Sequence, residues 1–254
     1  MEVALLTVGD ELLAGDTENT NATWLASRLS ERGVSVRRVL VLPDDRELIA
    51  DHVREYSDIF DAVILTGGIG GTPDDVTMEA VGDAFGREMV VDDRALADIE
   101  KTLEWLDAEG PDIEVDLNVE AEASIPDGAR PLLNSQGLAP GAVLNNVYVL
   151  PGIPDELKAM FDDVEEEFDG DAVSRFLYST EPEANLVGAL QDVGEKFDVA
   201  AGCYPDRGKG HNRLKLTATD DETLDAAAEW LIDAVGASET PVERDWDAER
   251  RDDE

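Results

Sequence analysis

A buried strand that runs into a glycine-rich loop is the feature that most constrains this chain. Residues 62–65 are apolar, residues 67–71 contain four glycines, and a helix is predicted over 76–85. Glycine lets the backbone approach a bound group closely and adopt a positive φ without a Cβ clash. The N–H groups of such a loop, with a helix N-terminus behind it, suit an anion such as phosphate. The segment predicts an α/β fold with an anion-binding turn, and an ordinary structural turn is the alternative.

The loop matches neither of two common nucleotide-binding patterns. Gly71 is followed by Thr72 and Pro73 without the lysine of a phosphate loop, and the glycine spacing differs from that of dinucleotide-binding turns. Asp74 and Asp75 come next, where their charges would repel a phosphate unless a cation lies between them. This arrangement indicates metal-assisted chemistry on a phosphorylated ligand.

Apolar runs alternate with helical patterns over the first two thirds of the chain. Strands separated by crossover helices indicate a parallel sheet, and Asn145-Asn146 predicts the turn of a hairpin. The expected strands are 3–8, 34–42, 62–65, 142–144 and 147–150, and the expected helices are 20–32, one that begins at Asp44 or Asp45, 76–85, 92–105, 116–123 and 154–168.

The pattern changes after Asp169-Gly170. A strand, a helix, two strands and a helix follow, which predicts a small α+β domain; their expected ranges are 173–178, 182–197, 199–204, 213–219 and 222–235. The predicted organisation is therefore an α/β domain over 1–168, a small α+β domain over 171–236 and an acidic tail over 237–254.

The charge balance describes the solvent more than the ligand. Sixty acidic and 20 basic residues give a formal net charge of −40, yet 43% of the residues are hydrophobic and periodic, which is typical of a folded chain. Such a protein repels itself in dilute buffer, and a screening length of about 3 Å in 1 M salt removes most of that cost. We expect a high-salt cytoplasm, as in halophilic archaea, and neither nucleic acid nor an anionic membrane as a partner.

The cysteine count and the lengths of the apolar runs argue against disulfide-rich, secreted and membrane-spanning proteins. Cys203 is the one cysteine, so no disulfide framework and no cysteine metal site is expected. The opening segment 1–8 is short for a signal peptide, and no apolar run approaches the length of a membrane span. We expect a cytoplasmic protein in which His52 and His211 are surface residues, because neither has metal-ligand spacing.

The ends of the predicted strands gather the residues that carry chemistry. Ligands of open parallel sheets bind outside the carboxyl ends of the strands, where residues 9–11, 43–45 and 67–75 supply five or six carboxylates. Oxygen ligands suit Mg²⁺ that is shared with substrate phosphates. Asp44 and Asp75 are the preferred ligands, whereas Asp45 and Asp74 are read as ordinary surface acids.

Other polar segments are less specific. The run Asn19-Thr20-Asn21 supplies either helix caps or ligand contacts. Residues 134–141 and 151–154 form two further turns rich in glycine, amide or proline. A basic island over 207–215 is either a solvated hairpin tip or a source of phosphate contacts from Arg207, Lys209 and Arg213.

Taken in order, these motifs resemble a known family. The segments Gly9–Leu13 with Thr20-Asn21, Gly67–Ala80, Asn134 with Gly137–Gly141, and Leu150–Glu156 are similar to the molybdopterin-binding (MoaB/Mog-like) domain in its CinA-type branch, the competence/damage-inducible protein family. The likeness spans residues 1–168, and the stretch around Gly202–Pro205 resembles the KH-like middle domain of CinA proteins. It implies a three-layer α/β/α fold with a mostly parallel sheet that binds a pterin or nucleotide phosphate, in a homo-oligomer (dimer or trimer).

The resemblance also implies site residues. Asp44 and Asp75 match two aspartates that serve a divalent metal such as Mg²⁺ and catalysis. Lys209 and Arg213 are candidate phosphate contacts on the basic island alone, and the resemblance does not imply them. The expected substrate- and phosphate-binding residues are Gly9, Glu11, Asn21, Gly67, Gly68, Gly70, Gly71, Thr72, Thr77, Glu79, Asn134, Gly141, Pro151, Gly152 and Pro154.

Two departures from the family pattern matter. The order Gly71-Thr72-Pro73 replaces the usual Gly-Pro-Thr, and the nicotinamide-nucleotide deamidase domain of full-length CinA has no counterpart in the sequence. Deamidase activity is therefore not expected. The first hypothesis is a metal-dependent nucleotide pyrophosphatase that acts on ADP-ribose. The alternatives are molybdopterin binding or adenylylation in molybdenum cofactor synthesis, and ligand or partner binding without catalysis.

Overall fold

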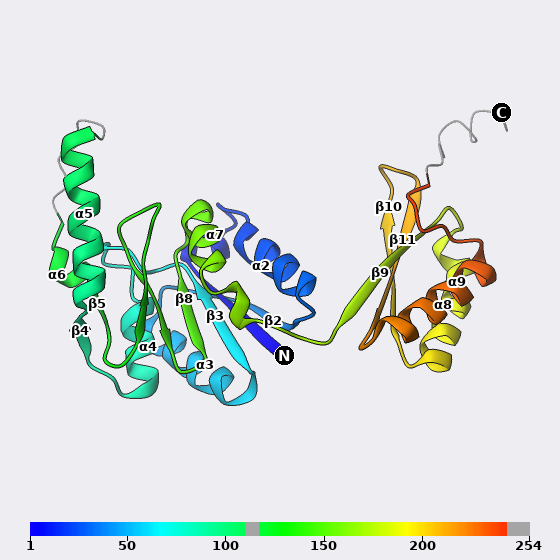
Figure 1. Ribbon diagram of the computed structural model, residues 1–254, viewed down its shortest axis with the longest axis horizontal. Coiled ribbons are helices and arrows are strands. Elements are labelled where there is room, and N and C mark those ends of the chain that lie inside the picture. The colour runs from blue at the N-terminus through cyan, green and yellow to red at the C-terminus, as the bar shows by residue number, and fades with distance from the viewer. Residues whose placement is uncertain (110–116, 243–254) are drawn as a thin grey trace. The chain divides into compact units, whose positions relative to one another are not determined.

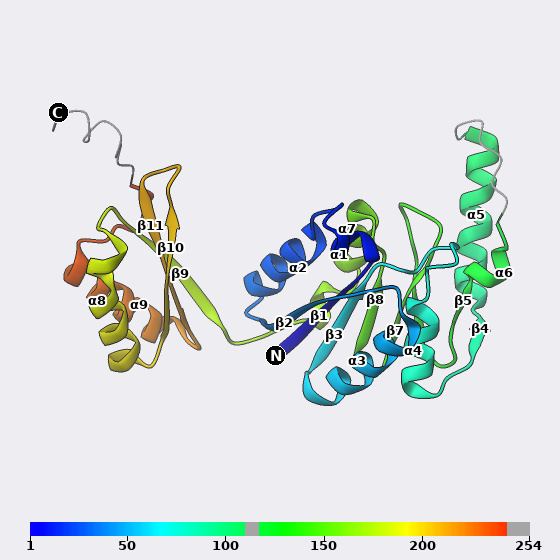
Figure 2. The ribbon, with the colours of Figure 1, turned by 180° about the vertical axis from the view of Figure 1, so that it is seen from behind.

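The computed structural model describes residues 1–109 and 117–242, in two compact units (Figures 1 and 2). The first unit is Met1–Gly170 and the second begins at Asp171. Residue 116 of the predicted helix 116–123 and most of the predicted acidic tail lie outside the described residues. No helix in the described ranges is both long and apolar enough to cross a lipid bilayer.

A six-stranded sheet with the order β2-β1-β3-β8-β7-β6 forms the centre of the first unit. β1 pairs in parallel with β2 and β3, and β3 with β8, whereas β7 runs antiparallel to β8 and β6. The strand bounds are Glu2–Val8 for β1, Ser35–Leu42 for β2, Ala62–Thr66 for β3, Arg130–Leu132 for β6, Gly141–Leu144 for β7 and Val147–Leu150 for β8.

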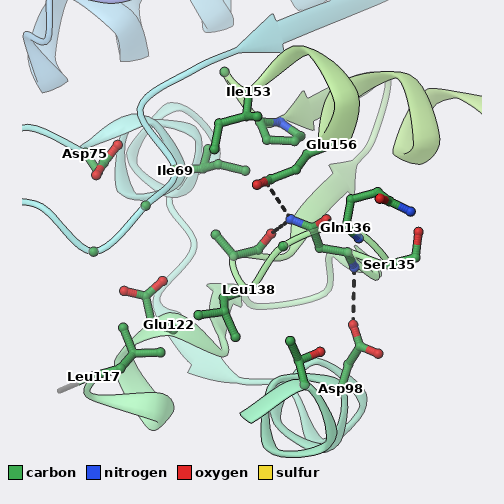
Figure 3. Close-up of a pocket in the computed structure, with 18 of the residues that line it drawn as sticks. Ile69, Asp75, Asp98, Leu117, Glu122, Ser135, Gln136, Leu138, Ile153 and Glu156 are labelled. Atoms are coloured by element: carbon green, nitrogen blue, oxygen red, sulfur yellow. Dashed lines mark hydrogen bonds between the residues drawn. The ribbon is translucent and has the colours of Figure 1, made fainter. Parts of the chain in front are cut away.

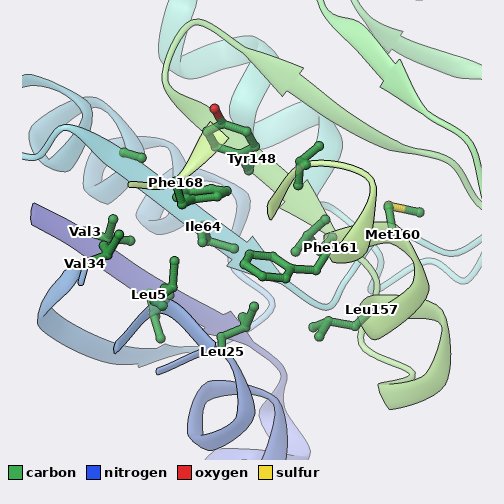
Figure 4. Close-up of a cluster of buried hydrophobic side chains, with 14 of the residues drawn as sticks. Val3, Leu5, Leu25, Val34, Ile64, Tyr148, Leu157, Met160, Phe161 and Phe168 are labelled. Carbon is green, nitrogen blue, oxygen red and sulfur yellow. The ribbon is translucent and has the colours of Figure 1, made fainter. Parts of the chain in front are cut away.

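Helices cover both faces of this sheet. Alternate residues of β1 enter opposite cores: Val3 and Leu5 pack with α2 (Thr20–Glu31) and α7 (Pro154–Asp162), as Figure 4 shows in part, and Leu6 packs with α3 (Arg46–Ile59) and α4 (Thr77–Phe85). Strands that are buried on both faces read as continuous apolar runs in the sequence. The three-layer α/β/α prediction is confirmed.

The helices begin where the sequence offers caps. The side chain of Asn19 accepts from the amide of Ala22 and starts α2, and Asp45 accepts from the amide of Leu48 and starts α3. Such caps satisfy N–H groups that have no partner within the helix. Asn19 and Asp45 therefore serve as helix caps.

The periodicity analysis missed several short elements. These are α1 (Asp10–Ala14), the two-stranded sheet of β4 (Met89–Val91) and β5 (Ser124–Pro126), and β6. The helix expected to end at Trp105 is α5 (Asp93–Glu109), the helix expected over 116–123 is α6 (Val119–Glu122), and the helix expected over 154–168 ends as α7 at Asp162 with a 3₁₀ turn (Glu165–Glu167) after it.

The second unit is a three-stranded antiparallel sheet with the order β10-β11-β9 and two helices. Leu177, Leu214 and Leu216 pack against the helices, and the bounds are Val173–Ser179 for β9, Glu183–Phe197 for α8, Ala200–Asp206 for β10, His211–Ala218 for β11 and Asp221–Val235 for α9. The small α+β prediction is confirmed.

Two expectations about the second unit are corrected. Ala237 is buried in the core of this unit and Ser238 pairs with Tyr178, so the segment that follows α9 belongs to the folded part. His211 is only 4% exposed rather than a surface residue, because its ring contacts the carbonyl of Val242 and the ring of Tyr178. His52 is half-buried.

Candidate functional site

The carboxyl ends of β1, β3 and β8 lie at one edge of the sheet, because these strands are adjacent and parallel. Two cavities open at this edge, one of about 1050 Å³ and one of about 250 Å³. Gly68, Asp75 and Gly152 line both cavities. A ligand that spans the two would therefore cross the glycine loop.

The first two glycines of the loop cannot be replaced without strain. Gly67 and Gly68 have φ values of 96° and 65°, and a Cβ on Gly67 would lie 2.3 Å from the carbonyl oxygen of Val8. The amide of Gly67 donates to the carbonyl of Leu150 at 3.1 Å, which ties the loop to β8. The amides of residues 68–71 donate to nothing among the described residues, so they are available to an anion.

Thr77 lies beneath this loop at the start of α4. Its amide donates to the carbonyl of Gly68 at 2.9 Å, and its side chain is fully buried. Its hydroxyl oxygen has no hydrogen-bond partner within the described part of the chain. A buried hydroxyl without a partner is costly, and Thr77 lines neither cavity.

The smaller cavity concentrates negative charge around Asp44. The amide of Asp10 donates to Asp44 Oδ2 at 2.9 Å. Burial raises the pKa of the Asp44 carboxyl, that hydrogen bond lowers it, and the charges of Asp10, Glu11 and Asp74 raise it again. Asp74, which the sequence analysis set aside, thus acts on Asp44 and lines the same cavity. A cation bound there would relieve this repulsion.

Asp75 is held in place by its own loop. Its Oδ2 accepts from the amide of Thr72 at 2.9 Å and from the Thr72 hydroxyl at 2.5 Å. Asp44 and Asp75 both line the smaller cavity, and their oxygens suit Mg²⁺. No group of three or more metal-binding side chains comes together in the described residues. A divalent cation therefore fits this pair only if water and ligand phosphates complete its coordination.

The larger cavity combines an apolar wall with polar groups (Figure 3). Trp105 of α5 is 54% exposed at this wall. Large exposed rings beside a cavity offer a stacking surface for a planar ligand. The large apolar side chains are Ile69, Trp105, Leu106, Leu117, Leu138 and Ile153, and the charged ones are Asp75, Asp98, Lys101, Glu122 and Glu156.

Asn134 lines the larger cavity but its side chain is committed to the loop that carries it. It donates to the carbonyl of Ala139 at 3.0 Å and to Glu156 Oε2 at 2.8 Å, and accepts from the amide of Gln136 at 3.2 Å. It is also only 3% exposed. Asn134 thus helps to hold its own loop, and the phosphate contact expected from the sequence stays a prediction.

The remaining predicted residues divide by position. Asn21 donates to the carbonyl of Gly152 at 2.7 Å and joins α2 to the turn after β8. Those at the smaller cavity are Gly9, Glu11, Asn21, Asp44, Gly67, Gly68, Asp75, Gly152 and Pro154; those at the larger are Gly68, Gly70, Gly71, Asp75, Asn134, Pro151 and Gly152.

Five further predicted contacts are Thr72, Glu79 and Gly141 in the first unit and Lys209 and Arg213 in the second. Thr72, Glu79 and Gly141 line neither cavity. Gly141 lies in β7, where a Cβ would come within 2.4 Å of both Met160 Sδ and the carbonyl oxygen of Val149, so packing requires this glycine. Lys209 lies in the turn between β10 and β11, and Arg213 on β11, both in the second unit.

Sequence reasoning missed the contribution of α5 and α6. Asp98, Lys101, Trp105 and Glu122 all line the larger cavity. Their spacing on α5 is that of an ordinary amphipathic helix, and one acidic residue among sixty carries no signal.

Comparisons with known proteins agree with this architecture. The family described as "probable molybdopterin binding domain" matches residues 4–169, and the family described as "FAD synthase, middle domain" matches residues 171–241. A protein of Archaeoglobus fulgidus is 34% identical over 229 residues, covering 89% of this chain and 95% of that protein.

Two further relatives carry the CinA name. A CinA-like protein of Gemmatimonas aurantiaca is 41% identical over 168 residues, covering 64% of this chain and 38% of that protein. The crystal structure of the protein CinA, of unknown function, from Thermoplasma acidophilum superposes with a TM-score of 0.59 at 33% identity, covering 66% of this chain and 99% of that one. The chain therefore belongs to the molybdopterin-binding-domain family, among its CinA-like members.

Proposed function

We propose that this protein is a divalent-metal-dependent hydrolase of a nucleotide diphosphate such as ADP-ribose. The observation that carries the proposal is the junction of the two cavities at Gly68, Asp75 and Gly152. A ligand with a diphosphate at its centre and a ring at one end has the same division of chemistry: charge at the glycine loop and an apolar surface beside it.

The chain's own groups would act mainly by electrostatics. Amides of residues 68–71 would donate hydrogen bonds to the phosphate oxygens, and Asp44 and Asp75 would hold the cation. A bound divalent ion polarises a phosphoryl oxygen and orients the attacking water. Phosphoryl transfer depends chiefly on such positioning and charge stabilisation. Water then breaks the diphosphate bond, and the products from ADP-ribose are AMP and ribose 5-phosphate.

The larger cavity would hold the base. Its volume of about 1050 Å³ is at the upper end of the range of ligand pockets, roughly 300–1,000 Å³. Trp105 and Leu138 offer apolar surface to a planar ring. Asp98 and Glu156 lie at the same cavity and would accept hydrogen bonds from amino groups on the ring edge.

The test is hydrolysis of ADP-ribose by the purified chain in molar KCl with MgCl₂, with AMP measured by chromatography. Asp75→Asn and Asp44→Asn should abolish AMP formation. Asp45→Asn is the matched control, because it removes the same charge next to Asp44 but keeps a side chain that caps α3. No AMP from the wild-type protein, with any of Mg²⁺, Mn²⁺ or Co²⁺, would refute the proposal.

A second candidate is handling of molybdopterin or its adenylylated form. The match of residues 4–169 to the molybdopterin-binding family favours it, and a pterin is also a planar ring beside a phosphate. Pterin that co-purifies with the protein would be detected by its fluorescence. Release of this pterin by added molybdopterin, but not by ADP-ribose, would support this alternative. Binding of either ligand without turnover would identify a binding protein.

A further inference from the structure

The carboxylate of Glu122, from α6 (Val119–Glu122), lies against the glycine loop. α6 is short, and the side chain of Asn118 caps it by accepting from the amide of Ala121 at 3.3 Å. Figure 3 shows Glu122, at the end of this helix, directed toward the loop that carries Asp75. A Cβ built on Gly71 would lie 2.1 Å from Glu122 Oε1, so the carboxylate touches the loop where its amides are free.

This contact places the negative charge of Glu122 beside loop amides that could bind an anion. Burial raises the pKa of Glu122, and the charges of Asp75 and Glu79 raise it further. The same carboxylate would repel a phosphate that binds to the amides of residues 68–71. Because Glu122 is only partly exposed, salt screens this repulsion less than it screens the charges on the outer surface.

A divalent cation would reduce the repulsion between Glu122 and a bound diphosphate. A diphosphate that arrives with Mg²⁺ would carry less negative charge, and Asp44 and Asp75 would hold the cation beside it. No three side chains of the described residues gather to bind a cation by themselves. The cation and the diphosphate would therefore each improve the binding of the other.

We propose that Glu122 is a specificity-determining residue that makes the glycine loop accept a diphosphate with its divalent cation and reject the free diphosphate. The proposal rests on the proposed function, since it requires a diphosphate at this loop. It assigns Glu122 no part in bond breaking. The gain is selectivity: uncomplexed nucleotides and inorganic anions of a salt-rich solvent do not occupy the site.

The experiment measures binding by calorimetry with the non-hydrolysable α,β-methylene analogue of ADP-ribose, in 1 M KCl with either EDTA or MgCl₂. Wild-type protein should bind the analogue far more tightly with Mg²⁺. Glu122→Gln should bind it roughly tenfold more tightly than wild type in EDTA, the gain expected when one nearby like charge is removed, and about equally in MgCl₂. Glu122→Ala repeats the measurement if the glutamine variant aggregates.

Glu120→Gln is the matched control, because Glu120 is exposed on the same helix and lines neither cavity. An equal gain in Glu120→Gln would attribute the effect to net charge and overturn the proposal. Unchanged binding in Glu122→Gln in EDTA would overturn it, and so would weakened binding in MgCl₂, which would make Glu122 a direct ligand. If no protein binds the analogue in either buffer, the proposed function itself fails.

Discussion

The buried hydroxyl of Thr77 gives the sharpest prediction about stability. The side chain is fully buried and its oxygen has no partner among the described residues. An unsatisfied buried polar group costs about 1–3 kcal/mol of folding free energy. Valine has nearly the same shape without that cost, so Thr77→Val should raise the free energy of unfolding by about 1 kcal/mol.

The expected shift can be scaled to the size of the unit. The first unit, Met1–Gly170, falls in the range where 1 kcal/mol changes the melting temperature by about 2–4 °C. Scanning calorimetry in molar KCl should resolve this change. Thr77→Ser is the control: it keeps the hydroxyl and loses a methyl group, so it should be destabilised by about 0.5–1.5 kcal/mol, as other buried methyl deletions are.

The reasoning would be refuted by a Thr77→Val protein that melts several degrees below wild type, since the hydroxyl would then have a stabilising partner such as a buried water. The same two variants test the assignment of Thr77 to phosphate binding. A hydroxyl reserved for the ligand predicts weaker diphosphate binding in Thr77→Val and unchanged binding in Thr77→Ser.

Three further predictions follow from particular contacts. Asp45→Ala should lower the free energy of unfolding by about 1 kcal/mol through loss of the α3 cap while AMP formation persists, the reverse of the result expected for Asp44→Asn. Gly141→Ala should cost about 1–3 kcal/mol by overpacking against Met160, with ligand affinity unchanged in the protein that remains folded; a loss of affinity alone would restore its predicted ligand role. Burial raises the pKa of Tyr148 to about 12, above an unfolded value near 10. The contribution of this side chain to the free energy of unfolding is therefore complete below pH 10 and is lost as pH rises toward 12. In urea titrations at pH 8 and 11, Tyr148→Phe should lose less stability between the two pH values than wild type.

The longer strands and helices of the first unit could be predicted because each one is marked by residues that are neighbours in the sequence. Runs such as Val3–Leu6 and Ala62–Leu65 are apolar at every position, which a strand covered on both faces requires. Asn19 and Asp45 mark helix starts by their own capping chemistry. Short strands such as β4 and β6 have three residues each, too few for a periodic pattern, and they were missed.

Part of the candidate site could be predicted where its residues adjoin in the sequence. The loop 67–75 carries its glycines and Asp75 together, and the parallel order of β1 and β3 brings Glu11 and Asp75 to one edge of the sheet. The partners of Asn134 and Gly141 within the chain could not be predicted, because polar side chains and glycines look alike in a sequence whether they bind a ligand or the chain itself. Only their hydrogen bonds and packing separate the two roles.

Sequence by itself determined the order of the longer strands and helices, the glycine loop and the carboxylates that follow it, since backbone freedom, capping and alternating burial depend on near neighbours. Tertiary structure alone decided that Glu122 lies beside this loop, that Trp105 lines the larger cavity and that His211 is buried. Those contacts join segments far apart in the chain, and their formation depends on how whole helices and strands pack, which no local pattern records.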